Sequence, residues 1–163
     1  MSSVESACIF CRIVRGELPA EVFYEDEVTL GFLDIAPLKL GHALLIPKVH
    51  YETIKDLPPD LVGPFFRTAR VLAKAVEVAF GADGSFSGYN THVSQSVPHF
   101  HLHVVPRQFG DKLFSGGRWV RHPYRDRETP ERLREQLQAA MGEAINSDGV
   151  PASPATPGGG RWR

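Results

Sequence analysis

One stretch of the chain carries three histidines, His99, His101 and His103, each followed by one apolar residue. Strict alternation of polar and apolar residues predicts a β-strand, in which successive side chains point to opposite faces. The three imidazoles are therefore expected on one face, and the apolar residues on the face that packs in the core. Pro98 and Pro106 bracket the run, as is typical where a strand begins and ends.

This row of imidazoles has three possible interpretations. It can be an ordinary strand with surface histidines, or it can bind a metal, because His-x-His supplies two ligands from one strand. Alternatively, His101 can be a covalent nucleophile whose neighbours His99 and His103 orient it and transfer protons. Three of the seven histidines fall within five residues, which argues against the first interpretation. The residues alone leave the other two open.

The two cysteines, Cys8 and Cys11, form a Cys-x-x-Cys pair near the N-terminus. Such a pair can be half of a zinc site, a redox-active dithiol or two buried thiols. A redox pair usually follows a strand and begins a helix, and no segment before Cys8 could be that strand. A zinc site needs two further ligands from elsewhere in the chain. With no other cysteine to pair with, the composition favours a cytoplasmic location.

Length and composition describe one ordinary globular domain. The chain has 163 residues, 42% of them hydrophobic and 23% charged, with a formal net charge of −1. We assign the domain to residues 1–145 and predict a disordered tail over 146–163, which is rich in Ser, Pro, Gly and Ala. The small net charge gives no reason to expect nucleic acid or a membrane as a partner. No apolar run could cross a membrane, and residues 1–7 do not resemble a signal peptide.

Periodicity predicts an α+β fold with a five-stranded, mostly antiparallel sheet, one long helix and shorter helices. The long helix has an apolar stripe over about residues 60–80, with Asp60 as the N-cap and Gly81 as the stop. A C-terminal helix is expected over about 130–143, beginning after Thr129. The other predicted elements are a short helix over 11–15, strands over 22–25, 28–34, 42–46 and 86–91, and the histidine strand between Pro98 and Pro106.

The histidine stretch resembles the signature of the histidine triad (HIT) superfamily of nucleotide hydrolases and transferases. The signature is three histidines that alternate with apolar residues, and here it is His99-Phe100-His101-Leu102-His103-Val104-Val105, preceded by Gln95-Ser96-Val97. The resemblance covers roughly residues 7–110, and the Cys-x-x-Cys N-terminus is similar to that of bacterial HIT-like proteins. It implies a five-stranded antiparallel sheet and a homodimer.

The resemblance also implies a nucleotide site. In relatives, apolar residues sandwich the base, a residue matching Asp34 binds the ribose hydroxyls, and polar residues contact the phosphates. One departure is Ser94, which stands where many relatives have glycine, a residue that lets the backbone approach a phosphate closely. The nucleotide-binding residues carried over by position are Ile9, Phe10, Ile13, Phe32, Leu33, Asp34, Ile35, Asn90, Gln95, Ser96, Val97, His101 and His103.

The implied reaction is a covalent transfer. His101 would attack the α-phosphate of a purine nucleoside phosphoramidate or dinucleoside polyphosphate, and water would hydrolyse the nucleotidyl-histidine. The carbonyl of His99 would hold the far nitrogen of the nucleophile, while His103 and Ser96 would bind the non-bridging oxygens. His103 or a neighbour would protonate the leaving group, and no metal is needed for the chemistry. The alternatives are a zinc-dependent hydrolase that uses the histidine row as ligands, and a non-catalytic nucleotide-binding or scaffold protein.

The resemblance supplies a possible ligand set for the cysteine pair. Some relatives, including the galactose-1-phosphate uridylyltransferase branch, carry zinc on positions that match Cys8, Cys11, His50 and His99. Thiolate sulfur and imidazole nitrogen are the ligands that structural zinc prefers. The resemblance therefore implies a structural zinc that joins the N-terminal segment to the histidine strand.

Beyond residue 110 the chain resembles no particular branch of the family. The segment 108–127 has many charges and no clear period, and it is predicted to be a loop. Its basic residues, together with Arg107, could reach a second phosphate or nucleotide, although we favour a solvated charged loop. These residues are Arg118, Arg121, His122 and Arg125.

Overall fold

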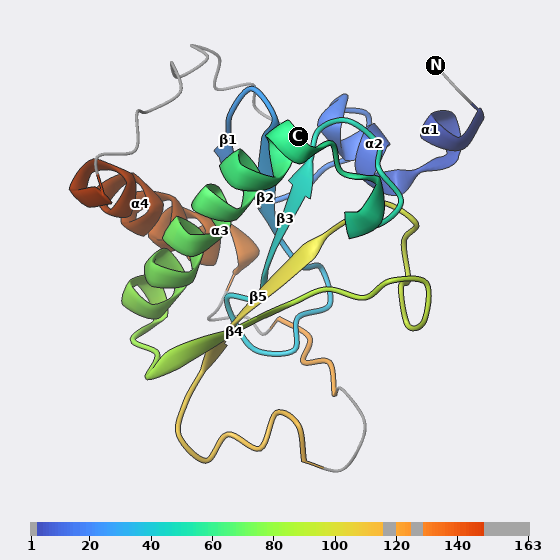
Figure 1. The fold of residues 1–163 in the computed structure, drawn as a ribbon. Coiled ribbons are helices and arrows are strands. Elements are labelled where there is room, and N and C mark those ends of the chain that lie inside the picture. Colours follow the sequence, from blue (N-terminus) through green and yellow to red (C-terminus); the bar gives the residue numbers. More distant parts are fainter. Residues whose placement is uncertain (1–2, 116–119, 125–128, 149–163) are drawn as a thin grey trace.

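The five strands form one antiparallel sheet, which confirms the predicted α+β architecture (Figure 1). The computed structural model describes residues 3–115, 120–124 and 129–148. The strand order is β1-β2-β3-β5-β4, and each neighbouring pair is antiparallel. The strands are β1 (Val22–Glu25), β2 (Thr29–Leu33), β3 (Ala43–Pro47), β4 (Gly84–Gly88) and β5 (Leu102–Arg107).

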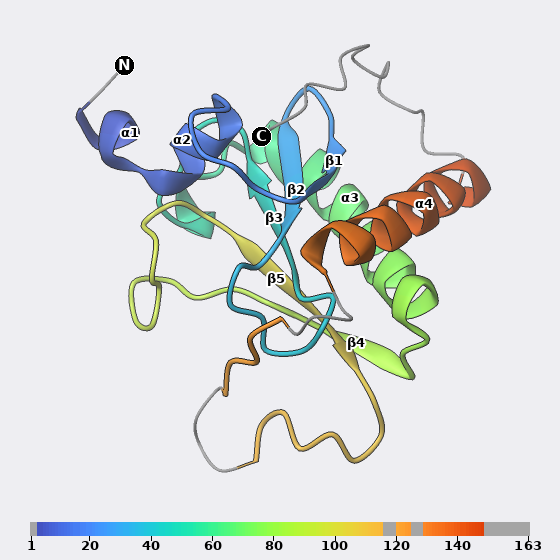
Figure 2. The same cartoon turned by 180° about the vertical axis from the view of Figure 1, so that it is seen from behind.

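Two long helices, α3 and α4, lie side by side and cover one face of the sheet (Figures 1 and 2). The fully buried Phe65, Leu72 and Leu137 hold them there, and burying each such side chain contributes about 1.5–3 kcal/mol. No helix in the described ranges is long and apolar enough to cross a membrane. The helices are α1 (Ser3–Ala7), α2 (Ile9–Val14), the 3₁₀ turn η1 (Ile54–Asp56), α3 (Pro59–Phe80) and α4 (Pro130–Asp148).

The pleat of the strands separates two cores. On β3, Leu45 belongs to the core under α3 and α4, whereas its neighbour Leu44 belongs to a second cluster that includes Phe10 of α2. On β5, Leu102 faces the long helices, so His103 faces the α2 side. Leu44 and His103 are cross-strand partners in the sheet. The face opposite the long helices is therefore the one that carries polar chemistry.

The histidine strand is shorter than predicted. β5 begins at Leu102 instead of near Pro98, and it includes Pro106. The backbone before Leu102 lies outside the sheet because the N–H of Phe100 donates to the carbonyl of Tyr51 (2.6 Å), which belongs to no strand. The predicted alternation of side chains nevertheless continues, since Phe100 packs in the core under the long helices.

The starts of α3 and β4 also differ from the prediction. α3 begins at Pro59, whose fixed φ suits the first helical position, and its N-cap is Pro58 and not Asp60. The fourth strand covers residues 84–88 instead of 86–91. The sequence patterns predict neither α1 nor η1, because each is too short to show a period.

The C-terminal helix is longer than predicted. α4 continues to Asp148 instead of ending near residue 143. The carboxylate of Asp148 lies 2.7 Å from Nζ of Lys74 and 3.0 Å from a guanidinium nitrogen of Arg70, which fixes the last turn of α4 against α3. The first residues of the predicted disordered tail are therefore helical, and residues 149–163 lie outside the described residues.

Gly41 lies in the turn that leads into β3, and its φ is +83°. A Cβ at this position would overlap the ring of Phe80 at the end of α3. Gly110 has a similar φ of +78°, but no heavy atom lies within 4 Å of the place where its Cβ would be. A side chain at Gly110 would therefore cause backbone strain alone, whereas a side chain at Gly41 would cause both backbone strain and steric overlap.

We predict that Gly110→Ala lowers the free energy of unfolding by about 1–2 kcal/mol through left-handed backbone strain alone. Gly41→Ala should lower it by about 1–3 kcal/mol more, because the ring of Phe80, which is partly buried and packs against the core, must move. Urea unfolding of both variants measures the difference. Equal losses in the two variants would show that Phe80 moves away without cost.

Candidate functional site

A cavity of about 790 Å³ lies beside α2, on the face of the sheet opposite the long helices. Apolar side chains from α2 and β2 form much of its wall, and the polar groups include Asp34, His101 and His103. This combination is typical of a small-molecule site. Its lining residues are Ile9, Phe10, Ile13, Leu18, Pro19, Ala20, Glu21, Phe32, Leu33, Asp34, Ile35, Leu44, Ser96, Val97, His101, His103, Arg121, Tyr124 and Pro130.

Most of the predicted nucleotide-binding residues line this cavity, but Asn90 and Gln95 do not. The Asn90 amide donates to the carbonyl of Ser94 (3.3 Å). The Gln95 amide donates to the carbonyl of Glu52 (2.6 Å), and its oxygen accepts from the N–H of His92 (2.8 Å). Both side chains therefore stabilise the loop before the histidine stretch.

His101 lines the cavity although only 3% of its surface is exposed. Its Nδ1–H donates to the backbone carbonyl of His99 at 2.7 Å, which places the lone pair on Nε2. Burial lowers the pKa of this imidazole, so the ring is neutral near pH 7. A neutral imidazole with a fixed tautomer is the form in which a histidine acts as a nucleophile.

His42 determines which nitrogen of His103 carries the proton. The backbone N–H of Leu38 donates to Nδ1 of His42 (3.2 Å), so the proton of His42 lies on Nε2. That nitrogen is 2.9 Å from Nδ1 of His103, which must accept, and the proton of His103 therefore lies on Nε2. Burial, with a smaller effect of nearby positive groups, lowers the pKa of both rings to about 3.

Sequence reasoning missed His42. A single histidine before an apolar strand carries no chemical signal of its own, and its neighbour in space depends on the pairing of β3 with β5. Leu44 is the cross-strand partner of His103, and His42 lies on the same face of the sheet two residues earlier. Only this pairing brings the two imidazoles together.

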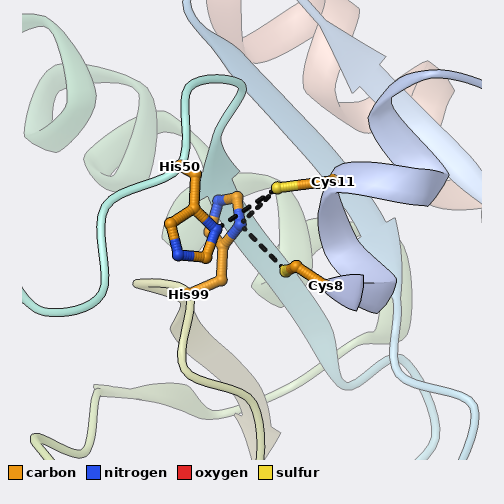
Figure 3. A group of neighbouring side chains, drawn as sticks. All are labelled: Cys8, Cys11, His50 and His99. Atoms are coloured by element: carbon orange, nitrogen blue, oxygen red, sulfur yellow. Dashed lines mark hydrogen bonds between the residues drawn. The ribbon is translucent and has the colours of Figure 1, made fainter. Parts of the chain in front are cut away.

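Cys8, Cys11, His50 and His99 converge beside the cavity (Figure 3). Their potential ligand atoms all lie within 4.8 Å of one another. Nδ1 of His99 is 3.5 Å from both sulfurs, and Nδ1 of His50 is 3.3 Å from Sγ of Cys11. Because Nε2 of His99 donates to the carbonyl of Pro47 (2.9 Å), its Nδ1 lone pair is directed at the sulfurs.

Two sulfurs and two imidazole nitrogens fit a tetrahedral zinc ion. Burial and the neighbouring Cys8 raise the pKa of the Cys11 thiol to about 12. A cation is what would make a thiolate favourable in this buried place. A second group of potential ligands comprises Asp34, His42 and His103, but the two imidazoles already use their facing nitrogens in a mutual hydrogen bond.

His99 connects the cysteine-histidine cluster with the cavity. Its ring belongs to the cluster, and its backbone carbonyl accepts the Nδ1–H of His101. The ring of Phe10 packs edge-on against both imidazoles, at centroid distances of 5.9 Å from His99 and 5.3 Å from His101. A displacement of His99 would therefore change the orientation of His101.

Of the predicted basic residues, Arg121 is the one in the described part of the chain that lines the cavity. Arg107 instead forms two hydrogen bonds of 2.6 Å to Asp111, and its guanidinium lies 4.8 Å from the centroid of the Phe114 ring. The basic residues at 118 and 125 lie outside the described residues. Arg107 is thus occupied in holding its own loop.

Comparison with known proteins places the chain in a family. A model of the HIT domain matches residues 15–110, more than half of the chain. The chain belongs to the HIT family. It is 36% identical over 124 residues to an adenylylsulfatase of Arabidopsis thaliana. This alignment covers 74% of this chain and 62% of the plant protein. The predicted superfamily is thereby confirmed.

Two further relatives match over nearly their whole length. An adenosine 5′-monophosphoramidase of Schizosaccharomyces pombe is 32% identical over 141 residues, covering 86% of this HIT chain and 97% of the yeast protein. The crystal structure of a zinc-bound histidine triad family protein from Mycobacterium smegmatis is 38% identical, with a TM-score of 0.75. That match covers 88% of this chain and 99% of the mycobacterial one.

The buried neutral imidazoles make the fold sensitive to acid. His42 and His103 have pKa values of about 3, whereas a histidine in an unfolded chain titrates near about 6.5. Between these values the unfolded chain binds more protons, so the free energy of unfolding falls as the pH falls below about 6.5. Each ring contributes a slope of about 1.4 kcal/mol per pH unit.

We predict that His42→Gln reduces this slope by about 1.4 kcal/mol per unit between about pH 6 and pH 4. The Gln amide can still accept from Leu38 and donate to His103, which preserves the local hydrogen bonds. Urea unfolding of metal-free protein across this range measures the slope. His122→Gln, at an exposed imidazole, is the control and should leave the slope unchanged. An unchanged slope in the His42 variant would show that His42 is already protonated in the folded protein.

Proposed function

We propose that this HIT protein is a nucleotide hydrolase or nucleotidyl transferase that acts on an α-phosphate through a nucleotidyl-histidine intermediate. The observation that supports this most is the hydrogen bond from Nδ1 of His101 to the carbonyl of His99 in the wall of the cavity. It holds the Nε2 lone pair ready, so no separate base is needed to activate the nucleophile. The names of the plant and yeast relatives support the reaction class.

The reaction divides into two displacements. Nε2 of His101 forms a bond to the α-phosphorus while the bond from phosphorus to the leaving group breaks. Because the pKa of His103 is about 3, its neutral ring acts as a hydrogen-bond donor to a non-bridging oxygen and not as an acid. The family resemblance implies His103 or a neighbour as the proton donor to the leaving group. We propose instead that the leaving group takes its proton from a water molecule, which becomes hydroxide. A second water then attacks phosphorus and gives a proton to that hydroxide. The phosphorus–nitrogen bond breaks, and His101 returns to its neutral form.

The substrates we propose are purine nucleoside phosphoramidates and dinucleoside polyphosphates. Ile9 and Ile35 lie at the cavity with exposed fractions of 45% and 92%, which a bound base would cover. Phe10 and Phe32 form an edge-on pair in the same wall, with centroids 5.5 Å apart. The carboxylate of Asp34 offers an acceptor for the ribose hydroxyls. We place Ser96 beside His103 as a second donor to the phosphate.

We propose further that a structural zinc binds Cys8, Cys11, His50 and His99, the ligand set that the family resemblance implies. When bound, zinc would neutralise the two thiolates and join α2 to the histidine stretch. The zinc-bound mycobacterial relative supports this assignment. His101 is not among the clustered ligands, which disfavours a zinc hydrolase that uses the whole histidine row. The chain's own imidazoles therefore carry the chemistry.

The assembly and the location of the protein remain predictions. The family resemblance implies a homodimer, and the cysteine content favours the cytoplasm. We propose a purine nucleotide as the ligand, without nucleic acid or a membrane as a partner. Light scattering tests the oligomeric state, and a mass equal to that of a monomer at working concentration would contradict the predicted homodimer.

We predict that His101→Asn lowers kcat/KM on adenosine 5′-phosphoramidate by about 10³- to 10⁶-fold, the scale of losing a nucleophile. AMP binding should be retained, because the apolar wall of the cavity and Asp34 remain, and metal content should stay as in the wild type, because His101 is not among the clustered ligands. His122→Asn, at an exposed position, is the control and should keep full activity. Loss of metal together with activity would support the zinc hydrolase instead. Nucleotide binding by the wild type without turnover of phosphoramidate, adenylylsulfate or diadenosine tetraphosphate would support a binding protein.

We predict close to one zinc per chain in protein purified without chelator or added metal. A Cys8→Ser/Cys11→Ser double variant should lose it, and its Tm should fall because α2 is no longer joined to the histidine stretch. Inductively coupled plasma analysis and thermal unfolding measure the two effects. The zinc proposal fails if the wild type holds almost none, or if the double variant retains a full equivalent.

A further inference from the structure

The segment 120–124 is held against the connection between β2 and β3 by three hydrogen bonds. The N–H of His122 donates to the carbonyl of Pro37, Nη1 of Arg121 donates to that of Ala36, and the hydroxyl of Tyr124 donates to that of Asp34, each at 2.7 Å. The segment lies beyond residue 110, where the match to the HIT family ends. It places Arg121 and Tyr124 in the wall of the nucleotide cavity, beside Asp34.

The two carboxylate oxygens of Asp34 have different surroundings. Oδ1 accepts the N–H of Ala36 (2.8 Å) and lies 3.5 Å from Nη1 of Arg121. Oδ2 lies 3.5 Å from Nδ1 of His42, but that nitrogen accepts from Leu38 and has no proton to give. Among the described residues, the donors therefore gather on Oδ1. Oδ2 is the oxygen of Asp34 with acceptor capacity left for a ligand in the cavity.

We propose that Arg121 is a positioning residue that makes Asp34 specific for an intact ribose diol, so that the site selects ribonucleotides over 2′-deoxyribonucleotides. The contact between Asp34 and the ribose is what the family resemblance implies. The role of Arg121, which lies beyond the family match, is the new part, and it rests on the proposed nucleotide function. A carboxylate that is only 7% exposed needs a charged partner and a fixed orientation to be an effective acceptor. Arg121 supplies both, because the carbonyl of Ala36 fixes its guanidinium beside Oδ1.

Orientation is the larger part of this effect. The side chain of Arg121 is 51% exposed. An ion pair that is so accessible to water contributes little energy by itself. A planar guanidinium held at one nitrogen, however, restricts the rotation of the neighbouring carboxylate. Arg121 lines the same cavity wall as Asp34 and His103, and its positive charge is one of the smaller causes that lower the pKa of His42 and of His103.

The test compares the binding of AMP and 2′-deoxy-AMP to the full-length protein by calorimetry, which does not depend on turnover. The wild type should bind AMP about 10- to 100-fold more tightly than 2′-deoxy-AMP, and we call this factor the affinity ratio. Its size is the scale of one hydrogen bond to a charged group. Arg121→Met should weaken AMP binding and barely change 2′-deoxy-AMP binding, so that the ratio approaches one. Arg121→Lys, which keeps the charge without the planar group, should give an intermediate ratio.

Two controls separate this effect from others. Asp34→Asn should already have a ratio near one, and adding Arg121→Met to it should change the ratio no further, because the two residues act as a unit. Arg70→Met breaks a comparable Arg–Asp pair between α3 and α4 and should leave the ratio as in the wild type. The urea midpoint of each variant shows whether the fold is retained.

Three results would overturn the inference. The first is a wild-type ratio near one, and the second is a ratio that Arg121→Met leaves unchanged while AMP still binds. The third is an equal loss of affinity for both nucleotides in Arg121→Met, which would make Arg121 a phosphate contact. In each of these cases the proposed nucleotide function stands. If the wild type binds neither nucleotide, both the inference and the proposed function fall.

Discussion

One hydrogen bond, from Nδ1 of His101 to the backbone carbonyl of His99, determines what this site can do. It fixes the tautomer of the buried imidazole, and it joins the wall of the cavity to the cluster of Cys8, Cys11, His50 and His99 through one residue. The hydrogen bond depends in turn on the path of the backbone before β5. That path lies outside the sheet because Phe100 donates to Tyr51 instead of to a strand. If a regular strand began at Pro98, the carbonyl of His99 would not be available to accept the hydrogen bond from the side chain of His101.

The sequence predicts the sheet, the long helices and the face on which the histidines lie, because all three follow from periodicity. The side chains of His99, His101 and His103 keep the alternation even where the backbone departs from β-geometry, since Phe100 and Leu102 still need the core. The lining of the cavity by α2 and β2 follows from the family resemblance and not from composition. On composition alone, those apolar residues would be assigned to the core.

What the sequence does not predict depends on long-range placement. His42 becomes part of the site only through the pairing of β3 with β5, and Arg121 only through hydrogen bonds to a connection more than eighty residues earlier. The backbone conformation of Ser94 is a local feature that the sequence also does not predict. Its φ of 62° lies in the left-handed region, which explains why glycine suits this position in relatives. The family resemblance implies that Gln95 binds the nucleotide, whereas in this structure its amide donates to the carbonyl of Glu52.

The central claim is that His101 becomes covalently bonded to the nucleotide during turnover. The most direct measurement is a rapid denaturing quench at alkaline pH during turnover of adenosine 5′-phosphoramidate, followed by mass spectrometry of the peptide that contains His101. The account predicts a transient adduct of one adenylyl group on His101, which forms at least as fast as AMP is released. Steady turnover without any adduct, or an adduct on another residue, would contradict it.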